Sequence, residues 1–163
     1  MKRIRIKKIL CPLDFSACSD YALRYALGMA NEFGAELKLL HVVELPFLPS
    51  YSLGGVPDLS APMEAIEQGA RQRMEQLVEQ CRAEHEDVDA TVRTGTPFLE
   101  IVSYAEEIGA DLIVAGSHGR SGLRHMLIGS VAEKLVRKAP CPVLTVKNPE
   151  ECFEKEEEAR DEG

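Results

Sequence analysis

The sequence predicts an α/β fold: one doubly wound, five-stranded parallel sheet in the order 3-2-1-4-5, with helices on both faces. Two observations predict it. Short apolar segments alternate along the chain with longer segments whose apolar residues recur at helical spacing. Four of the five short segments are almost continuously apolar, which is typical of parallel strands that are covered on both faces. Right-handed crossovers between such strands place helices on both sides of the sheet.

The first half of the chain opens with an Ile- and Leu-rich run at residues 6–12, the first expected strand. Ser16 or Ser19 can cap the helix that follows, and Gly34 ends it as a left-handed glycine would. Residues 36–43 form the second expected strand. The apolar residues that share one face of the first helix are Ala22, Ala26, Met29, Ala30 and Phe33.

Residues 44–63 contain four prolines and two glycines, which predicts a long loop. A long amphipathic helix is expected at 64–85, and the third strand at 88–93. Thr96 is the expected N-cap of the third helix, with Pro97 in its first turn. The apolar face of the long helix consists of Ile66, Ala70, Met74, Leu77, Val78 and Cys81.

The last third of the chain supplies the remaining elements. The third helix carries an apolar face and is closed by Gly109. Residues 111–116 form the fourth strand, 130–139 the fourth helix and 142–147 the fifth strand. The apolar residues of the third helix are Phe98, Ile101, Val102, Ala105 and Ile108.

Length and charge divide the chain into two parts. Its 163 residues fit one domain, expected at 1–147, and the tail at 148–163 holds eight acidic and two basic residues. Such a tail has little to bury and is expected to be disordered or a frayed helix. The body is nearly neutral, which argues against a nucleic-acid partner. No apolar run reaches 18 residues, so we expect a cytoplasmic protein that does not span a membrane.

The five cysteines are odd in number and contain no CxxC pair. This argues against a disulfide framework and against a zinc site, and favours buried, reduced thiols. His41, at the end of the second strand, is expected to be a structural residue. His118 and His125 are expected to be loop histidines, because no third metal ligand accompanies them.

The stretch from Gly116 to Ser130 carries the chemistry of the chain. It contains neither a Walker A sequence nor a GxGxxG turn. Gly116 and Gly119 can adopt positive φ and let the backbone approach a ligand, and Gly129 and Ser130 begin the fourth helix, where free amides favour phosphate. The alternative is that these glycines only form turns. Arg120 and Arg124 can either neutralise phosphate or remain solvated, and the sequence does not separate these two cases.

A doubly wound sheet binds its ligand at the carboxyl ends of the strands, where the winding reverses. In the expected order, this point lies between the first strand, which ends at Pro12, Leu13 and Asp14, and the fourth, which ends at Gly116. Both polar loops would then border one crevice. Asp14 can instead cap the first helix, and the two roles are compatible.

These residues resemble the universal stress protein family. Its nucleotide-binding members carry G-x2-G-x9-G-[ST], which Gly116, Gly119, Gly129 and Ser130 match in full. The opening "KKILCPLDFS" and the run "LLHVVE" resemble the first two strands of the family. The resemblance covers nearly all of residues 6–147 and leaves out the acidic tail.

The resemblance implies an ATP site. Asp14 and the backbone around Pro12 and Leu13 would face the adenosine, Val42 the adenine, and Ala115 and Gly116 the nucleoside. Gly119, Gly129, Ser130 and Val131 would hold the phosphates. Ala132 departs from the hydroxyl residue found there in some ATP-binding members. The expected cofactor-binding residues are therefore Pro12, Leu13, Asp14, Val42, Ala115, Gly116, Gly119, Gly129, Ser130 and Val131.

The function that the resemblance implies is a nucleotide-dependent stress-response regulator or adaptor, homodimeric through the fifth strand, that acts on an unidentified protein partner. Mg²⁺ would be held by the phosphates of the ATP rather than by protein ligands. Two alternatives remain: a slow ATPase or adenylyl-transfer enzyme on the same scaffold, and an interaction module without a ligand. No catalytic residue is assigned, because the chain shows no Walker lysine and no nucleophile elbow.

Overall fold

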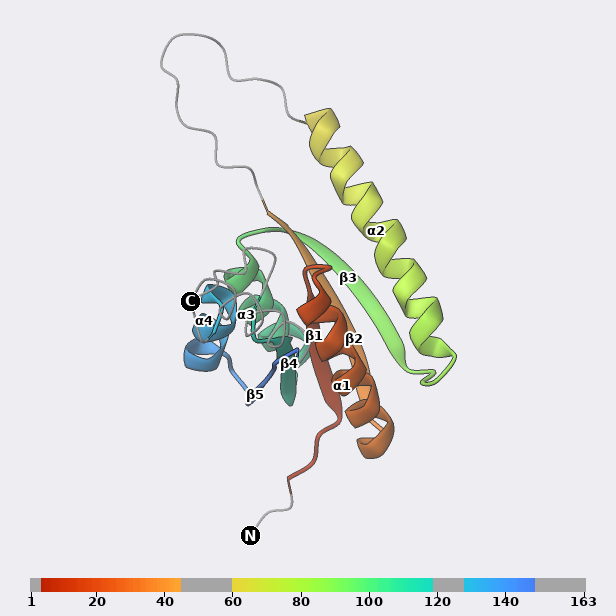
Figure 1. The fold of residues 1–163 in the computed structure, drawn as a ribbon, viewed down its shortest axis with the longest axis vertical. Helices are drawn as coiled ribbons and strands as arrows, with labels where there is room; N and C mark the ends of the chain where they lie inside the picture. The colour runs from red at the N-terminus through yellow and green to blue at the C-terminus, as the bar shows by residue number, and fades with distance from the viewer. Residues whose placement is uncertain (1–3, 45–59, 119–127, 149–163) are drawn as a thin grey trace, which may run out of the picture.

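The computed structural model describes residues 4–44, 60–118 and 128–148 (Figure 1). The five strands are all parallel and lie in one sheet in the order β3-β2-β1-β4-β5. The predicted fold class and strand order are confirmed. The strands are β1 (Lys8–Leu13), β2 (Glu36–Glu44), β3 (Val88–Gly95), β4 (Leu112–Gly116) and β5 (Val143–Val146).

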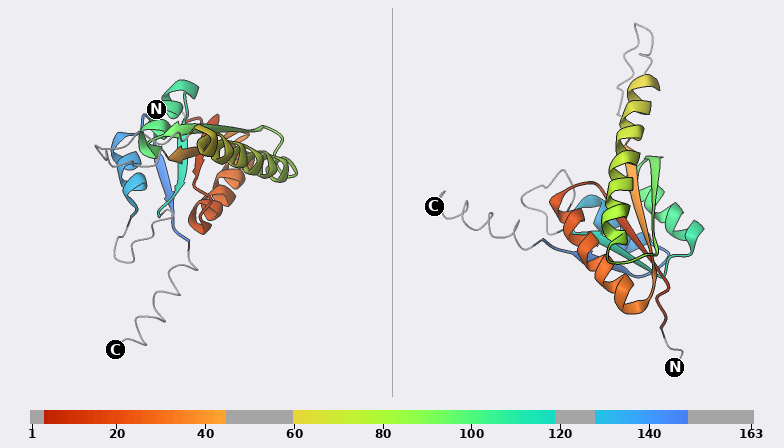
Figure 2. Two further views of the ribbon diagram at one scale, coloured as in Figure 1. Left: turned by 90° about the horizontal axis from the view of Figure 1, so that it is seen from above. Right: turned by 90° about the vertical axis from the view of Figure 1, so that its right-hand side faces the viewer.

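Helices cover both faces of the sheet (Figure 2). Helices α1 and α2 pack on one face, where Leu23 and Met74 join the core with strand residues such as Leu39. Helices α3 and α4 pack on the other face, where Ile101 and Leu135 are buried. Four helices are described: α1 (Ala17–Phe33), α2 (Ser60–Arg82), α3 (Pro97–Ile108) and α4 (Ser130–Lys138).

The helix ends follow the expected capping chemistry. Ser16 is the N-cap of α1, and its hydroxyl accepts a hydrogen bond from the Ser19 amide at 3.2 Å. Gly34 and Gly109 end α1 and α3 in the left-handed conformation, with φ of 60° and 62°. Thr96 precedes α3 as its N-cap residue but makes no side-chain cap hydrogen bond, whereas Pro97 occupies the first turn as expected.

The structure corrects several expectations. Helix α2 begins at Ser60 instead of residue 64, because a proline in the first turn, here Pro62, needs no intrahelical amide. Phe33 and Ile66, assigned to apolar faces, are about half exposed, at 47% and 54%. Tyr104, which was not assigned to a core face, is buried, and its hydroxyl contacts the Thr91 hydroxyl at 2.9 Å.

Strands β1 and β4 border the point at which the winding of the sheet reverses. They are paired at Ile9↔Leu112 and Leu10↔Ile113. β1 pairs with β2 along its whole length, up to Leu13, and β4 also continues beyond its last pair with β1. The two central strands are therefore unpaired with each other at their carboxyl ends, which leaves room for a crevice there.

Pro12 explains why this ladder stops. The Ile113 amide donates to the carbonyl of Pro142, just before β5, at 3.0 Å. Successive amides of a strand point to opposite sides, so the Leu112 amide points towards β1. Given the pairs Ile9↔Leu112 and Leu10↔Ile113, the β1 amides that point towards β4 are those of Leu10 and residue 12. Proline has no amide hydrogen to donate, so the next step of the ladder cannot form.

Gly116, the last residue of β4, lies against the start of α1. A Cβ atom at this position would be 3.0 Å from the carbonyl carbon and oxygen of Cys18 and 3.2 Å from the amide nitrogen of Ser19. The positive φ expected at Gly116 is not found, since the described glycines with positive φ are Gly34, Gly95 and Gly109. Close packing of two backbones, rather than a left-handed turn, is what requires glycine at position 116.

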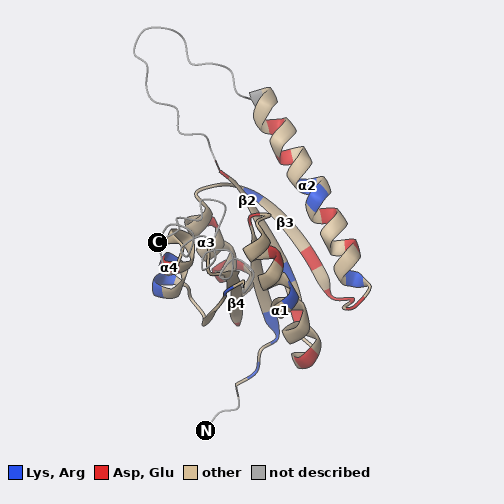
Figure 3. Cartoon of the chain, in the orientation of Figure 1, with Lys and Arg blue, Asp and Glu red and all other residues tan. Residues whose placement is uncertain are grey.

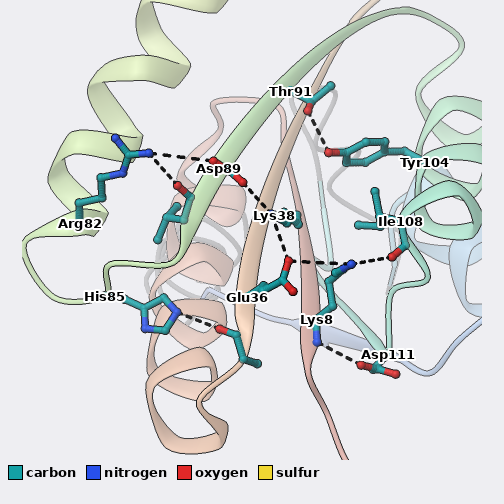
Figure 4. A network of polar contacts seen from close by, with 12 residues as sticks. Lys8, Glu36, Lys38, Arg82, His85, Asp89, Thr91, Tyr104, Ile108 and Asp111 are labelled. Atoms are coloured by element: carbon teal, nitrogen blue, oxygen red, sulfur yellow. Dashed lines mark hydrogen bonds and ion pairs between the residues drawn. The ribbon is translucent and has the colours of Figure 1, made fainter.

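A network of charges joins the strands at the opposite, amino-terminal end of the sheet (Figure 4). Lys38 contacts Asp89 at 2.7 Å and Glu36 at 3.2 Å, and the Lys8 amide donates to Asp111 at 3.0 Å. Burial opposes the charge on Lys38, but Asp89 and Glu36 outweigh it and raise the pKa of Lys38. The hydrogen bond from Lys38 in turn lowers the pKa of Asp89.

We expect Gly116→Ala to destabilise the protein without any ligand present. The added methyl group would clash with the backbone of Cys18, and overpacking of this kind costs about 1 to 3 kcal/mol. Gly28→Ala is the matched control, because Gly28 lies in α1 and, apart from the backbone of that helix and its two chain neighbours, nothing lies within 4 Å of its added Cβ. The Gly28→Ala substitution should raise the free energy of unfolding by about 0.5 to 1 kcal/mol. Urea unfolding measures both, and an unchanged stability for Gly116→Ala would contradict the packing argument.

We expect Pro12→Ala to extend the ladder between β1 and β4. The new amide at position 12 would face β4 and could donate to it, so its hydrogen exchange should be slowed relative to an unstructured peptide. Hydrogen exchange followed by NMR in the ligand-free protein measures this. If the new amide exchanges at the unprotected rate, the missing proline amide is not what separates the two strands.

Candidate functional site

The carboxyl ends of β1, β2 and β4 and the start of α4 enclose a pocket of about 220 Å³. Nine of the ten residues predicted to bind a cofactor line it. Gly119 lies outside the described residues, so its predicted role stays a prediction. The nine residues are Pro12, Leu13, Asp14, Val42, Ala115, Gly116, Gly129, Ser130 and Val131.

The β1 side of the pocket is a short turn held by its own side chains. An oxygen of the Asp14 carboxylate accepts hydrogen bonds from the amide of Ser16 at 3.0 Å and from its hydroxyl at 2.6 Å. Ser16, not Asp14, is the N-cap of α1. Asp14 therefore supports the cap indirectly, by holding Ser16, and it also lines the pocket.

His41 lies behind this turn, on β2. It is only 6% exposed, and its Nδ1 lies 2.7 Å from the Leu13 carbonyl oxygen. The expectation of a structural role for His41 is confirmed by this bond. His41 also lines the pocket, which the sequence did not suggest.

Ser117 joins the two halves of the glycine motif. Its amide donates to Val146 of β5 at 2.8 Å, and its carbonyl accepts from the Gly129 amide at 2.6 Å. The second bond brings the end of β4 and the beginning of α4 together, although 11 residues separate Ser117 from Gly129 in the chain, and the first ties the same end of β4 to β5. Ser117 is buried, and its hydroxyl contacts Nδ1 of His118 at 3.0 Å.

The start of α4 presents backbone amides at the pocket. Gly129 is the N-cap residue, with an extended backbone (φ −69°, ψ 155°), and it has no side chain to bond the first amides of the helix. Ser130, Val131 and Ala132 follow and line the pocket. The first amides of a helix have no partner within the helix and carry the positive end of its dipole, so this wall favours an anion.

The charged side chains that line the pocket are themselves negative, although the start of α4 favours an anion. Asp14 and Glu44 line it, and none of its described lining residues is a lysine or an arginine. A phosphate group held at the start of α4 would therefore meet backbone amides and two nearby carboxylates. Such an arrangement suits an anion whose charge is partly offset by a cation.

Sequence reasoning missed the apolar floor of the pocket. Leu40, Ile101 and Leu135 line it as well as belonging to the core beneath α3 and α4. The helical periodicity of the third helix marked Ile101 as a core residue. Periodicity gives no sign that the core extends to the pocket. Ser117 was detectable in principle, because it directly follows the glycine at the end of β4.

Cys11, Cys18 and Cys81 are buried, as expected, and Cys141 is partly exposed. Burial raises the pKa of the Cys11 thiol, and Cys81 adds to the shift. Burial likewise raises the pKa of Cys81 and of Cys141. These thiols stay protonated at neutral pH, and the thiol form is a poor nucleophile and a poor metal ligand.

No group of three or more His, Cys, Asp or Glu side chains in residues 4–44, 60–118 and 128–148 is arranged to hold a metal ion. None of the helices within these ranges is long and apolar enough to cross a membrane. Acidic and basic side chains are interspersed along α2 (Figure 3).

Comparison with known proteins agrees with the fold. Residues 5–147 match the model of the universal stress protein family. A universal stress protein of Methanocaldococcus jannaschii is 37% identical over 144 residues, which cover 88% of this chain and 83% of the relative.

Solved structures show the same relationship. Universal stress protein UspA from Lactobacillus plantarum has a TM-score of 0.76 at 27% identity, covering 88% of this chain and 99% of its own. A universal stress protein from Archaeoglobus fulgidus, solved in complex with dAMP, has a TM-score of 0.59 at 26% identity, covering 89% and 100% of the two chains. With a family match over nearly the whole described fold, this chain belongs to the universal stress protein family.

Proposed function

We propose that this protein binds ATP in the pocket between β1 and β4 and acts as a nucleotide-dependent regulator or adaptor in the stress response. One observation carries the proposal: the chain segments around Gly116 and Gly129 are joined through Ser117 at the same pocket that Asp14 lines. The dAMP complex of the related Archaeoglobus fulgidus protein supports an adenine nucleotide as the ligand. A cytoplasmic location stays a prediction.

The proposed roles follow the position of each residue in the pocket. Val42, at the end of β2, lies on the apolar side that suits a base, and Asp14 suits the hydroxyl groups of a ribose as a hydrogen-bond acceptor. The backbone of Pro12 and Leu13 and that of Ala115 and Gly116 would face the nucleoside from the two central strands.

The phosphates would lie at the start of α4. The backbone amides of Gly129, Ser130 and Val131 and the hydroxyl of Ser130 are the donors proposed to hold them. Gly119 is proposed to approach the phosphates, on the basis of the motif alone. Ala132 is buried and lines the pocket, so position 132 offers only its backbone amide.

The acidic lining of the pocket favours Mg²⁺-bound ATP over free ATP. Asp14 and Glu44 would repel an uncompensated triphosphate, and a divalent cation on the phosphate oxygens reduces that repulsion. In this proposal the phosphates hold the cation, and the protein contributes no ligand cluster of its own.

We also propose that the protein forms a homodimer through β5. β5 is an edge strand, and Leu144 on it is 36% exposed. Val136 of α4 exposes 56% of its surface. An exposed, apolar edge strand is prone to pair with a second chain, and pairing across a two-fold axis would bury this one. A partner protein in the stress response is proposed without further identification.

We expect isothermal titration calorimetry to detect binding of Mg-ATP, with weaker binding when EDTA removes the Mg²⁺. Gly129→Val should weaken binding by at least about tenfold, or roughly 1.4 kcal/mol, because a branched side chain occupies the space before the amides of α4. Gly119→Val should act similarly. Ser130→Ala should cost about 0.5 to 1.5 kcal/mol, since one hydrogen bond is lost.

Gly28→Val is the control for these variants, because Gly28 lies on the exposed side of α1 with nothing near its added Cβ. It should bind Mg-ATP like the parent, and circular dichroism should show all variants folded. Absence of binding to the parent at millimolar Mg-ATP would refute the proposal. Unchanged binding by folded Gly129→Val would show that this glycine only forms a turn.

We expect light scattering at micromolar concentration to give twice the monomer mass of 18.0 kDa. Leu144→Lys should shift the protein towards the monomer, because it places a charge in the proposed interface. Leu99→Lys is the comparison, since Leu99 is also exposed, at 57%, but belongs to α3 and not to the edge strand β5. A parent protein that is monomeric throughout would rule out the dimer.

A further inference from the structure

Phe15, which follows Asp14 in the turn beside the pocket, has an unusual backbone. Its φ is 63°, and it is the only residue other than glycine with a positive φ in the described part of the chain. Large side chains rarely adopt this conformation, and Asn, Asp and Gly are the residues that usually do. Contacts elsewhere in the fold must therefore hold Phe15 in place.

The Phe15 ring has two such contacts. It stacks on the ring of His41, with 4.2 Å between the centroids and an angle of 27° between the planes. The guanidinium carbon of Arg73, on α2, lies 4.1 Å from the centroid of the same ring. Two groups cannot occupy one face of a ring at this distance, so the Phe15 ring lies between His41 and Arg73.

The contacts form a closed arrangement around the turn. His41 is fixed on β2 and bonds the Leu13 carbonyl at 2.7 Å, while its ring supports Phe15 two residues further along. Asp14 lies between these two anchored residues. Arg73 closes the arrangement from the side of α2, a helix that otherwise packs on β2 and β3.

We propose that Arg73 is a positioning residue for the pocket. By holding Phe15 against His41, Arg73 keeps the Asp14 turn in its ligand-binding conformation, and so couples the occupancy of the pocket to the position of α2. The coupling rests on the proposed function insofar as Asp14 contacts a nucleotide. Because coupling between two sites is reciprocal, a ligand bound to Asp14 strengthens the attachment of α2 through Arg73.

Arg73→Ala tests the proposal, with Arg71→Ala as the matched control. Arg71 lies on the same helix and is also exposed, and its described contact is an ion pair with Glu67 at 3.9 Å. Arg73→Lys keeps the charge but loses the planar stacking group, so it should fall between the parent and Arg73→Ala. Urea unfolding of each variant separates a local effect from a loss of global stability.

The first measurement needs no ligand. The Ser16 amide donates to Asp14 and the Ser19 amide donates to Ser16, so both report on the turn. Their hydrogen exchange, followed by NMR, should become about two- to fivefold faster in Arg73→Ala, which is the range set by an exposed cation–π contact. Exchange should not change in Arg71→Ala. Equal exchange in the parent and Arg73→Ala overturns the proposal.

The second measurement is the dissociation constant of Mg-ATP by calorimetry. Arg73→Ala should raise it about two- to fivefold and Arg71→Ala should leave it unchanged. Equal affinities for the parent and Arg73→Ala overturn the coupling. If the parent binds no Mg-ATP, the proposed function fails, and the exchange measurement alone decides whether Arg73 positions the turn.

Phe15→Leu provides a second variant in case loss of Arg73 unfolds the protein. It keeps an apolar side chain at position 15 but removes the aromatic face that His41 and Arg73 share. Exchange at Ser16 and Ser19 should again be faster, and adding Arg73→Ala to Phe15→Leu should then have no further effect on it. Additive effects of the two substitutions would overturn the proposal.

Discussion

The missing amide hydrogen of Pro12 is the constraint on which the arrangement of the site depends. It ends the ladder between β1 and β4 at Leu10↔Ile113, while β1 remains paired with β2. The two central strands can therefore separate at the reversal of the winding, where the pocket lies. The same strands stay joined at their amino-terminal ends, so the opening is confined to one end of the sheet.

Glycine 116 serves the site indirectly. Its lack of a side chain allows the end of β4 to approach the first turn of α1, next to Cys18. That contact sets the distance between the two central loops, one carrying Asp14 and the other carrying Ser117. A residue of the glycine motif can thus be required by the packing of the protein itself, and its substitution is expected to affect stability even without a ligand.

The fold was predictable because each of its signals is local in the sequence. Apolar runs, helical spacing and the glycines that end α1 and α3 gave the elements, and right-handed crossovers then gave the strand order. That Asp14 and Gly116 border one pocket followed from that order. Periodicity does not give the width of a buried face, which explains the exposed Ile66. The role of Pro12 depends on which way each amide points, and that of Gly116 on a backbone contact distant in sequence.

The charge network at the amino-terminal end of the sheet has a consequence for how this chain can change. Lys8, Glu36, Lys38 and Asp89 are joined at the end of the strands away from the pocket. Substitutions there can alter the thermal tolerance of the fold while the geometry around Asp14 is retained. Changes in the stability of the fold and changes in the shape of the pocket can therefore arise from separate sets of residues, one at each end of the same five strands.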